Sequence, residues 1–308
     1  MRTVRCHEFG SPHVLQVVSA PDPEPGPGEV LIDVEAAGIS FADVRLRAGG
    51  MPVPLPFSPG FEVAGVVVGV GSGVDSALVG RPVVAIVGGG GYSSMAVAPV
   101  SAVRVRPDSL SLQDALGLVG QGVTALGVMS VAGVRAGDVV LVEAAAGGVG
   151  SLLVQLVKRA GATVVAATRG EEKLAVAKEL GADRVVDYSV PGWAAGMGEV
   201  TVVLGSVGGA VGRESFGALT DGVGRMVVYG SAAGDSAVSV QEVFERGLWV
   251  GGFVSTHLSG QRREGFLDEA FSSGLRVVAG FALGLGEVAQ AHRMVEERGT
   301  VGKNILLT

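Results

Sequence analysis

Short apolar runs separated by glycine- and proline-rich turns dominate the first hundred residues. EVLIDVEAAGI (29–39) and EVAGVVVGV (62–70) are rich in β-branched residues, and the longest helical face in this part is the stretch 42–47. Runs of this kind between turn residues predict β-strands. Further strands are predicted at VLQVV (14–18), RPVVAIV (81–87) and SMAVAP (94–99). The N-terminal part of the chain is therefore expected to be β-rich.

The pattern changes near residue 112, after which short apolar strands alternate with amphipathic helices. Strands are predicted at 138–143, 162–168, 184–188, 201–205, 224–230 and 248–254, and helices at 148–160, 171–180 and 213–219. This alternation is typical of a doubly wound parallel sheet, the Rossmann arrangement. The fold class expected is therefore α/β.

A glycine-rich loop, AAAGGVG (144–150), joins the first of these strands to its helix. Small residues let the backbone approach a pyrophosphate, and the helix N-terminus supplies unpaired N–H donors. An ordinary tight turn is the alternative, but the order strand, loop, helix, strand favours dinucleotide binding. The predicted cofactor-binding residues in the loop are Ala146, Gly147, Gly148, Val149 and Gly150.

The end of the second strand bears on which dinucleotide is bound. An NAD site usually has an acidic residue there for the ribose 2′-hydroxyl, whereas this chain has Thr168 followed by Arg169. Arg169 and Lys173 are suited to pair with a 2′-phosphate, which favours NADPH. The alternative is that these residues are only the solvated start of a helix, where the helix dipole favours an acid such as Glu171.

Composition narrows the classes of protein and partner. The chain has 308 residues, 48% of them hydrophobic, and a net charge of −7. These values favour about two domains with a sizeable core, and neither nucleic acid nor a membrane as partner. The uncharged stretches 82–103 and 115–134 contain glycine and polar residues, so they are expected to be buried elements rather than membrane spans. MRTVRCHEFG has no apolar signal-peptide region, and Cys6 is the only cysteine, which suits the reducing cytoplasm.

The metal-ligand inventory is small. One cysteine excludes a four-cysteine zinc site, and the histidines His7, His13, His257 and His292 show no close ligand spacing. We therefore expect no metal site. Hydride transfer without a Lewis acid requires an acceptor that is already activated, such as a quinone or an α,β-unsaturated carbonyl.

Several motifs, in order along nearly the whole chain, resemble those of a known family. They are AAGISFADVRLRAG (36–49), PGFEVAGVVVGVGSGV (59–74), QGVTAL (121–126), AAAGGVG (144–150), GADRVVDY (181–188) and AHRMVEERGTVGKNILL (291–307). They resemble the zinc-independent, zeta-crystallin-like quinone oxidoreductases of the medium-chain dehydrogenase/reductase superfamily. The resemblance implies a GroES-like catalytic domain of residues 1–115 completed by 256–308, and a Rossmann domain of residues 116–255. It also implies an active site in the cleft between the two domains.

The resemblance also implies roles for individual residues. Lys173, Tyr188 and Arg298 would contact the 2′-phosphate. The remaining cofactor contacts would lie near the nicotinamide, at Thr124, Gly230, Ser231 and Phe253.

Two departures from the family pattern concern catalysis. Ser40 stands where the family has an asparagine, and Met51 stands where related enoyl reductases have a proton-donating tyrosine. Tyr92 and Asp43 are the remaining polar candidates, although a hairpin end and a helix cap are the plainer interpretations of these two. The candidate catalytic residues are therefore Ser40, Thr124 and Tyr92.

The function expected is NADPH-dependent reduction of a quinone or enone. A trans-acting enoyl reductase of polyketide or fatty-acid metabolism, and an NADPH-binding protein with little turnover, are the alternatives. The resemblance further implies a homodimer, for which the apolar strand 248–254 offers an edge.

Overall fold

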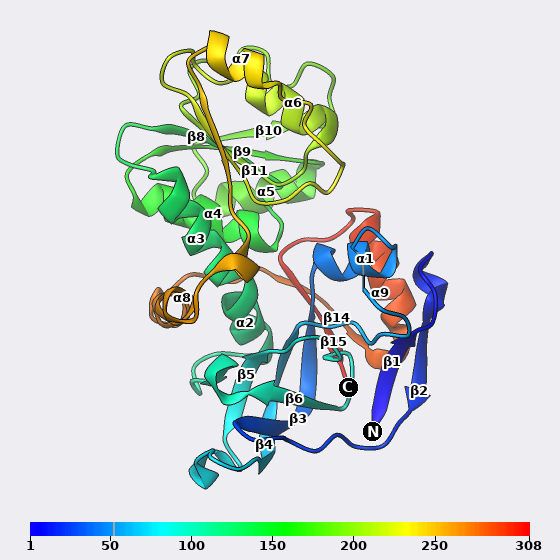
Figure 1. Ribbon diagram of the computed structural model, residues 1–308. Helices are drawn as coiled ribbons and strands as arrows, with labels where there is room; N and C mark the ends of the chain where they lie inside the picture. The colour runs from blue at the N-terminus through cyan, green and yellow to red at the C-terminus, as the bar shows by residue number, and fades with distance from the viewer. Residues whose placement is uncertain (52) are drawn as a thin grey trace. The chain divides into compact units, whose positions relative to one another are not determined.

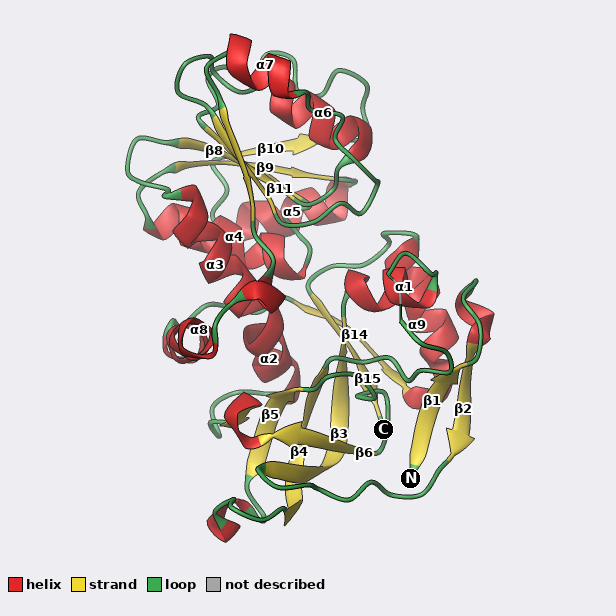
Figure 2. Cartoon of the chain, viewed as in Figure 1, coloured by secondary structure: helices red, strands yellow, loops and turns green. Residues whose placement is uncertain are grey.

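The computed structural model describes residues 1–51 and 53–308. The chain divides into two compact units, one of residues 1–120 with 277–308 and the other of residues 121–276. Each unit has its own main sheet and core, and β1 and β2 of the first unit form a further two-stranded sheet, as Figure 2 shows by secondary structure. The C-terminal segment thus completes the unit that the N-terminus begins.

The first unit is built mainly of antiparallel strands. Its strands are β1 (Arg2–Cys6), β2 (Leu15–Ser19), β3 (Glu29–Ile39), β4 (Glu62–Val70), β5 (Pro82–Ile86), β6 (Met95–Pro99), β7 (Val103–Val105), β14 (Ala279–Gly284) and β15 (Lys303–Leu307). Its helices are α1 (Phe41–Arg47), α2 (Leu112–Leu116) and α9 (Val288–Glu296), with short 3₁₀ turns at Pro12–Val14, Ser76–Leu78, Val100–Ala102 and Leu285–Glu287. The main sheet has the order β14-β15-β3-β4-β5-β7, and β6 also pairs with β3. The β-rich region predicted from the sequence is therefore observed.

The core of this unit follows from the side-chain alternation along β3. Val30, Ile32 and Val34 are all buried, whereas the intervening Asp33 and Glu35 are exposed. The buried face packs with valines of β4 and β5 and alanines of β6 into one apolar cluster. A second cluster joins β1 and β15 to α9. Alternation of this kind is what one buried face of a sheet requires.

The second unit contains a parallel sheet with helices on both faces. Its strands are β8 (Val139–Glu143), β9 (Thr163–Thr168), β10 (Arg184–Asp187), β11 (Val202–Gly205), β12 (Arg225–Val228) and β13 (Trp249–Gly252). Its helices are α3 (Val123–Ala132), α4 (Gly148–Arg159), α5 (Glu171–Glu179), α6 (Gly209–Gly217), α7 (Val240–Glu245) and α8 (Gly260–Ser272), with a 3₁₀ turn at Ser255–His257. In Figure 1, α3, α4 and α5 lie on one face of this sheet, and α6 and α7 on the other.

The strand order of the second sheet is β10-β9-β8-β11-β12-β13, with all neighbours parallel. Numbered within the sheet, this is the order 3-2-1-4-5-6 of a dinucleotide-binding fold, so the predicted Rossmann arrangement is confirmed. The order reverses between β8 and β11. In open α/β sheets, ligands bind at such a switch point, beyond the carboxyl ends of the strands.

Several boundaries differ from the sequence expectation, and α3, α7 and α8 lie where no helix is predicted. Helix α6 begins at Gly209 rather than at residue 213. Gly208 and Gly209 have positive φ values, and two glycines in a row are typical of a turn, so the sequence pattern predicts a helix start that is too late. The compact units divide after residues 120 and 276, rather than after 115 and 255. The shift at the second boundary arises because α8 packs against α3 within the second unit.

The apolar stretch near residue 115 forms one helical run. Helices α2 and α3 are joined by a π-helical segment, Gly117–Gly122. Among the described residues, the run Leu112–Ala132 is long and apolar enough to cross a membrane, but 67% of its most apolar window is buried inside the protein. Within the units, α2 packs on β3, β4 and β15, and α3 packs on α4 and α8. These contacts are typical of a core helix.

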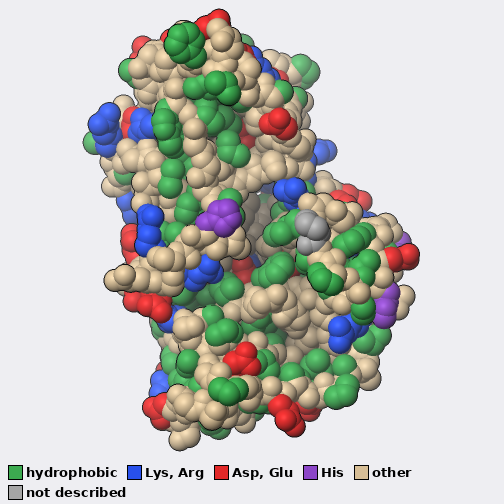
Figure 3. All heavy atoms as spheres, in the orientation of Figure 1, with side chains coloured by type: hydrophobic (Ala, Val, Ile, Leu, Met, Phe, Trp, Pro, Cys, Tyr) green, Lys and Arg blue, Asp and Glu red, His purple; other side chains and the backbone are tan. Residues whose placement is uncertain are grey.

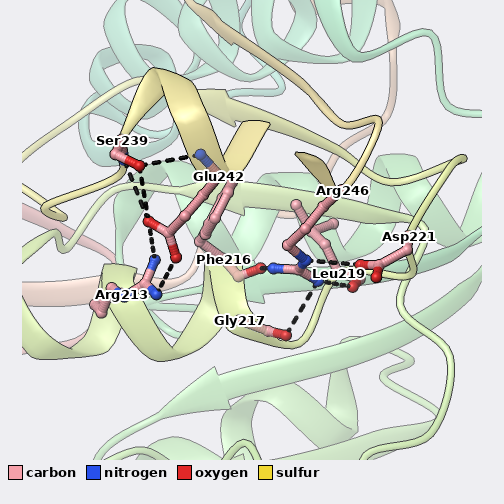
Figure 4. A network of polar contacts seen from close by, with 8 residues as sticks. All are labelled: Arg213, Phe216, Gly217, Leu219, Asp221, Ser239, Glu242 and Arg246. Atoms are coloured by element: carbon pink, nitrogen blue, oxygen red, sulfur yellow. Dashed lines mark hydrogen bonds and ion pairs between the residues drawn. The ribbon is translucent and has the colours of Figure 1, made fainter. Parts of the chain in front are cut away.

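Two arginines tie α7 to α6 (Figure 4). Arg213 makes a bidentate ion pair with Glu242. The N–H of Glu242 also donates to Oγ of Ser239, the N-cap of α7. Arg246 pairs with Asp221 and donates to backbone carbonyls at the end of α6. Both guanidinium groups lie over the ring of Phe216, 5.5 and 5.3 Å from its centroid. The α6–α7 side of the sheet is thereby held together without a large apolar face on α7.

Candidate cofactor site

The glycine loop connects β8 to α4 at the switch point of the parallel sheet. Ala144 has a φ of 48°, in the left-handed region, and its carbonyl accepts the N–H of Gly147 at 2.8 Å. The N–H of Ala145 donates to the carbonyl of Ala167 on β9 at 3.1 Å. The loop is therefore fixed both by an internal turn and by a bond to the neighbouring strand.

The five loop residues predicted to bind the cofactor divide into a buried pair and an accessible group. Ala146 and Gly150 are buried, whereas Gly147, Gly148 and Val149 keep partial exposure. A Cβ on Gly150 would lie 2.3 Å from the carbonyl oxygen of Ala144, so glycine is needed there for the helix to pack on the turn. The accessible residues are the ones placed to meet a ligand.

The start of α4 is suited to an anion. Its N-cap is Gly147, which has no side chain that could accept an N–H of the first turn. The first N–H groups of a helix have no intrahelical acceptor, and the helix dipole is positive there. This donor set fits the pyrophosphate of a dinucleotide, which would be held by the backbone of residues 147–150.

Gln121 lies directly beside this loop and was not among the predicted site residues. A Cβ on Gly148 would lie 2.6 Å from the side-chain carbonyl carbon of Gln121. Within the described residues, the buried Oε1 of Gln121 has no hydrogen-bond partner. A polar end left unpaired beside the glycine loop is consistent with a ligand group at this position. The signal was present in the motif QGVTAL, of which only the threonine was singled out.

The carboxyl end of β9 carries the residues expected to select the cofactor. Thr168 is buried and its carbonyl accepts the N–H of Tyr188, whereas Arg169 is exposed. Gly170 has a φ of 81°, and its N–H donates to Asp187 at 3.0 Å. Hydrogen bonds from Ser189 and Gly170, together with the positive charge of the nearby Arg169, hold the pKa of Asp187 below its usual value. The carboxyl end of β9 thus carries the exposed Arg169, next to Asp187, whose carboxylate already accepts hydrogen bonds from Gly170 and Ser189.

The other residues predicted to bind the 2′-phosphate lie on both units. Lys173, on α5, and Tyr188, after β10, belong to the second unit together with Arg169. Arg298 belongs to the first unit, where it follows α9 with a φ of 57°. Convergence of the four residues on one phosphate remains a prediction.

Several residues predicted near the nicotinamide lie together in the second unit. Phe253 follows β13 and is buried, and its ring would be 2.0 Å from a Cβ on Gly127. Gly127 is on α3, the helix that carries Thr124. The structure therefore places Phe253 against the helix of Thr124. Gly230 and Ser231 follow β12 on the loop that contacts the β11 turn.

Ser40 lies in the first unit as the N-cap of α1. Its N–H and Oγ both donate to Oδ2 of Asp43, at 2.8 and 2.7 Å, and Oδ1 of Asp43 accepts the N–H of Gly60. Burial raises the pKa of Asp43 to about 6, although the bonds from Ser40 act in the opposite direction. Asp43 is thus a buried residue of the helix cap, as the sequence had suggested as an alternative to a catalytic role. Ser40 remains partly exposed.

The structure corrects the hypothesis that Tyr92 is catalytic. Tyr92 is fully buried in the second apolar cluster of the first unit, and its hydroxyl is 3.3 Å from Nε2 of His292. Burial raises the pKa of Tyr92 and lowers that of His292 to about 3. Tyr92 has no exposed surface and packs with residues of α9, so its phenol lies in the core rather than at an accessible site.

No group of three His, Cys, Asp or Glu side chains suited to hold a metal ion occurs in residues 1–51 and 53–308. The histidine nearest a candidate residue, His292, is engaged with Tyr92. The one cysteine, Cys6, is buried with its thiol directed to the carbonyl of Glu8.

Two family models match the chain, one in each of its parts. Residues 26–108 match the alcohol dehydrogenase GroES-like domain, and residues 148–272 match the zinc-binding dehydrogenase domain. The GroES-like fold predicted for the N-terminal part is therefore confirmed. Together the two matches cover most of the chain.

Individual relatives span the whole chain. It is 32% identical to a probable quinone oxidoreductase of Schizosaccharomyces pombe, over 99% of this chain and 96% of the relative. It is 32% identical to a 2-haloacrylate reductase of a Burkholderia species, over 98% of this chain and 97% of the relative.

Solved structures are similar to this chain over its whole length. The quinone oxidoreductase of Escherichia coli in complex with NADPH is 28% identical, with a TM-score of 0.93 and full coverage of both chains. An NAD-dependent alcohol dehydrogenase is 32% identical, with a TM-score of 0.89 and full coverage of both chains.

Proposed function

Because the chain belongs to the zeta-crystallin-like quinone oxidoreductase family of the medium-chain dehydrogenase/reductase superfamily, we propose that it reduces a quinone or an α,β-unsaturated carbonyl with NADPH and without zinc. In general terms, the chain is an NAD(P)-dependent oxidoreductase that acts on a small molecule. The observation that carries the proposal is the glycine loop between β8 and α4, at the switch point of the sheet.

NADPH is proposed over NADH because of the charge at the end of β9. Arg169 stands where an acid would bind a ribose 2′-hydroxyl, and Lys173 follows on α5. A guanidinium paired with a phosphate makes strong, charge-assisted hydrogen bonds. Relatives of similar fold have been solved with NADPH, although one is named an NAD-dependent dehydrogenase. The residues of this edge therefore support the choice more directly than the relatives do.

The residues of the chain would position the reactants rather than supply strong acid–base groups. The bound nicotinamide cofactor would supply a hydride. The backbone of residues 147–150 would bind the pyrophosphate, and Phe253 would form an apolar wall next to the helix of Thr124. Ser40 and Thr124 are small polar side chains that would orient the ring. Proximity in a water-poor site accounts for a large share of such a rate enhancement.

The acceptor follows from the groups that the described residues provide. A quinone or enone that accepts hydride becomes a conjugated anion, which water can protonate. A simple ketone would form an alkoxide and would need a Lewis acid or a positioned proton donor. Tyr92 is buried and Met51 replaces the tyrosine of enoyl reductases. The name of the 2-haloacrylate reductase supports reduction of a conjugated double bond.

The test is NADPH oxidation over a panel of quinones, enones and enoyl thioesters, with a simple ketone as control. We expect turnover with quinones or enones and little with the ketone. Preference for enoyl thioesters would favour the trans-acting enoyl reductase. Tight NADPH binding without turnover on the whole panel would favour a binding protein.

We further propose a cytoplasmic homodimer that binds neither nucleic acid nor membrane. Strand β13 is the last strand of the parallel sheet, and its Trp249 and Val250 are 47% and 36% exposed. An apolar edge strand of this kind pairs readily with a second copy. On the face drawn in Figure 3, basic side chains are mixed with acidic ones, which supports the absence of a nucleic-acid partner.

A further inference from the structure

Glu143 is a buried acid at the point where the parallel sheet reverses its strand order. It ends β8, whose preceding residues are all valine or leucine, and its side chain has no exposure. The next residue begins the glycine loop. Burial of a carboxyl group costs free energy unless hydrogen bonds or an opposite charge compensate for the lost water.

The carboxylate holds the turn that follows the neighbouring strand. Its Oε2 accepts the N–H of Ser206 at 2.9 Å and the N–H of Val207 at 2.7 Å. These residues follow β11, whose last residue, Gly205, lies at ordinary contact distance from the carboxylate, since a Cβ there would be 3.7 Å from Oε1. Oε1 itself has no hydrogen-bond partner within the described part of the chain. One oxygen thus satisfies two backbone donors that would otherwise be buried and unpaired.

The same turn holds the loop after β12. The carbonyl of Ser206 accepts the N–H of Ala232 at 3.2 Å, and the carbonyl of Val207 accepts the N–H of Ala233. A Cβ on Gly230 would lie 2.9 Å from the oxygen of Ser206, so the two loops pack backbone to backbone. A continuous set of contacts therefore runs from Glu143 through the β11 turn to the loop of Gly230 and Ser231.

We propose that Glu143 is a positioning residue for the nicotinamide half of the cofactor. It touches no ligand itself. By fixing the β11 turn, it sets the position of the loop that carries Gly230 and Ser231, whereas the pyrophosphate loop is held independently by Ala144 and Ala167. This inference rests on the proposed function, since it assumes that a nicotinamide dinucleotide binds at this edge of the sheet.

The test compares two ligands that differ by the nicotinamide group. Glu143→Leu removes the acceptor at similar volume, and Glu143→Gln keeps one oxygen that can accept both N–H groups. For Glu143→Leu we expect a 10- to 100-fold loss of NADPH affinity and less than a 3-fold loss for 2′-phospho-ADP-ribose. Glu143→Gln should restore NADPH affinity to within about 3-fold of wild type. An equal loss for both ligands, no loss, or failure of Gln to restore affinity would overturn the proposal.

A second variant covers the case in which Glu143→Leu does not fold. Gly230→Ala places a methyl group against Ser206 and displaces the same loop without touching the buried acid. The same split between NADPH and 2′-phospho-ADP-ribose is expected, and equal affinities for the variant and the wild type would contradict the inference. If the wild type binds neither ligand, the proposed function fails rather than this inference.

Discussion

Gly150 packs against the carbonyl of Ala144, because a Cβ on Gly150 would lie 2.3 Å from that oxygen and 2.8 Å from the carbonyl carbon. The two residues are the ends of the glycine loop. Close approach of α4 to the end of β8 therefore depends on the glycine itself. By contrast, a Cβ on Gly147 would lie 3.1 Å from the same oxygen, and the φ of Gly147 is −78°, which any residue adopts.

This contrast predicts different outcomes for two alanine variants. Gly150→Ala should lower the free energy of unfolding by about 1–3 kcal/mol, the usual cost of overpacking, measured by urea denaturation. Gly147→Ala should lose less stability than Gly150→Ala, because its Cβ would meet the same oxygen at 3.1 Å rather than 2.3 Å, but it should bind NADPH more weakly, measured by fluorescence titration. Equal stability of the two variants would show that the loop tolerates bulk at both positions.

The choice between NADPH and NADH is predicted to depend on Arg169. Removal of one charge-assisted hydrogen bond costs about 1.5–3 kcal/mol, so Arg169→Ala should weaken NADPH binding by roughly 10- to 100-fold. NADH affinity should be unchanged, because NADH has no 2′-phosphate. Arg159→Ala is a matched control, since Arg159 is held by the carbonyls of Ser273 and Gly274. A wild type that binds NADH as tightly as NADPH would contradict this role of Arg169.

The buried Asp43 predicts a specific dependence of stability on pH. Burial raises its pKa to about 6, with Glu62 raising it further and Ser40 and Lys303 lowering it. In the unfolded chain the pKa is about 3.9, so between about pH 4 and 6 the folded state holds a proton that the unfolded state has released. Asp43 therefore makes the free energy of unfolding fall as the pH rises through this window, by on the order of 3 kcal/mol, and the loss persists above it.

The measurement is a series of urea denaturation curves from pH 4 to 7. Asp43→Asn cannot titrate, so the difference in unfolding free energy between wild type and this variant should change across the window. Asp108→Asn, at an exposed position, serves as the control and should follow the wild type. Parallel pH profiles for wild type and Asp43→Asn would mean that Asp43 keeps an ordinary pKa.

The homodimer is predicted to depend on the exposed edge of β13. Val250→Lys should place a charge in the strand-to-strand interface and yield a monomer, measured by light scattering at micromolar protein. Val79→Lys is the control, because Val79 is 48% exposed in the other unit and far from this edge in sequence. A monomeric wild type, or a Val250→Lys variant that remains dimeric, would contradict the proposed interface.

The Rossmann unit was largely predictable because its signals are local. Each strand of the parallel sheet is a short apolar run, and the glycine loop follows directly after one of them. The period of hydrophobic residues changes from strand to helix within a few positions of the observed boundaries. The exceptions are the start of α6, where two glycines with positive φ concealed the helix, and helices α3, α7 and α8, for which the sequence pattern predicted no helix.

The features that escaped prediction depend on residues far apart in the chain. The donors to Glu143 come from residues 206 and 207, so the sequence shows only an acid at the end of an apolar strand. The partner of Tyr92 is His292, on a helix that follows two hundred residues later. Four glycines before a phenol indicate the end of a hairpin, and the burial of Tyr92 against residues of α9 appears only in the structure.

Hydride transfer without zinc is tested by NADPH oxidation with protein that has been treated with a metal chelator. The purified enzyme would be dialysed against the chelator, analysed for zinc, and assayed with a quinone or enone and with a plain alcohol plus NADP⁺. We expect unchanged rates of quinone or enone reduction and no oxidation of the alcohol. Oxidation of a plain alcohol that is abolished by the chelator and restored by zinc would contradict zinc-independent hydride transfer.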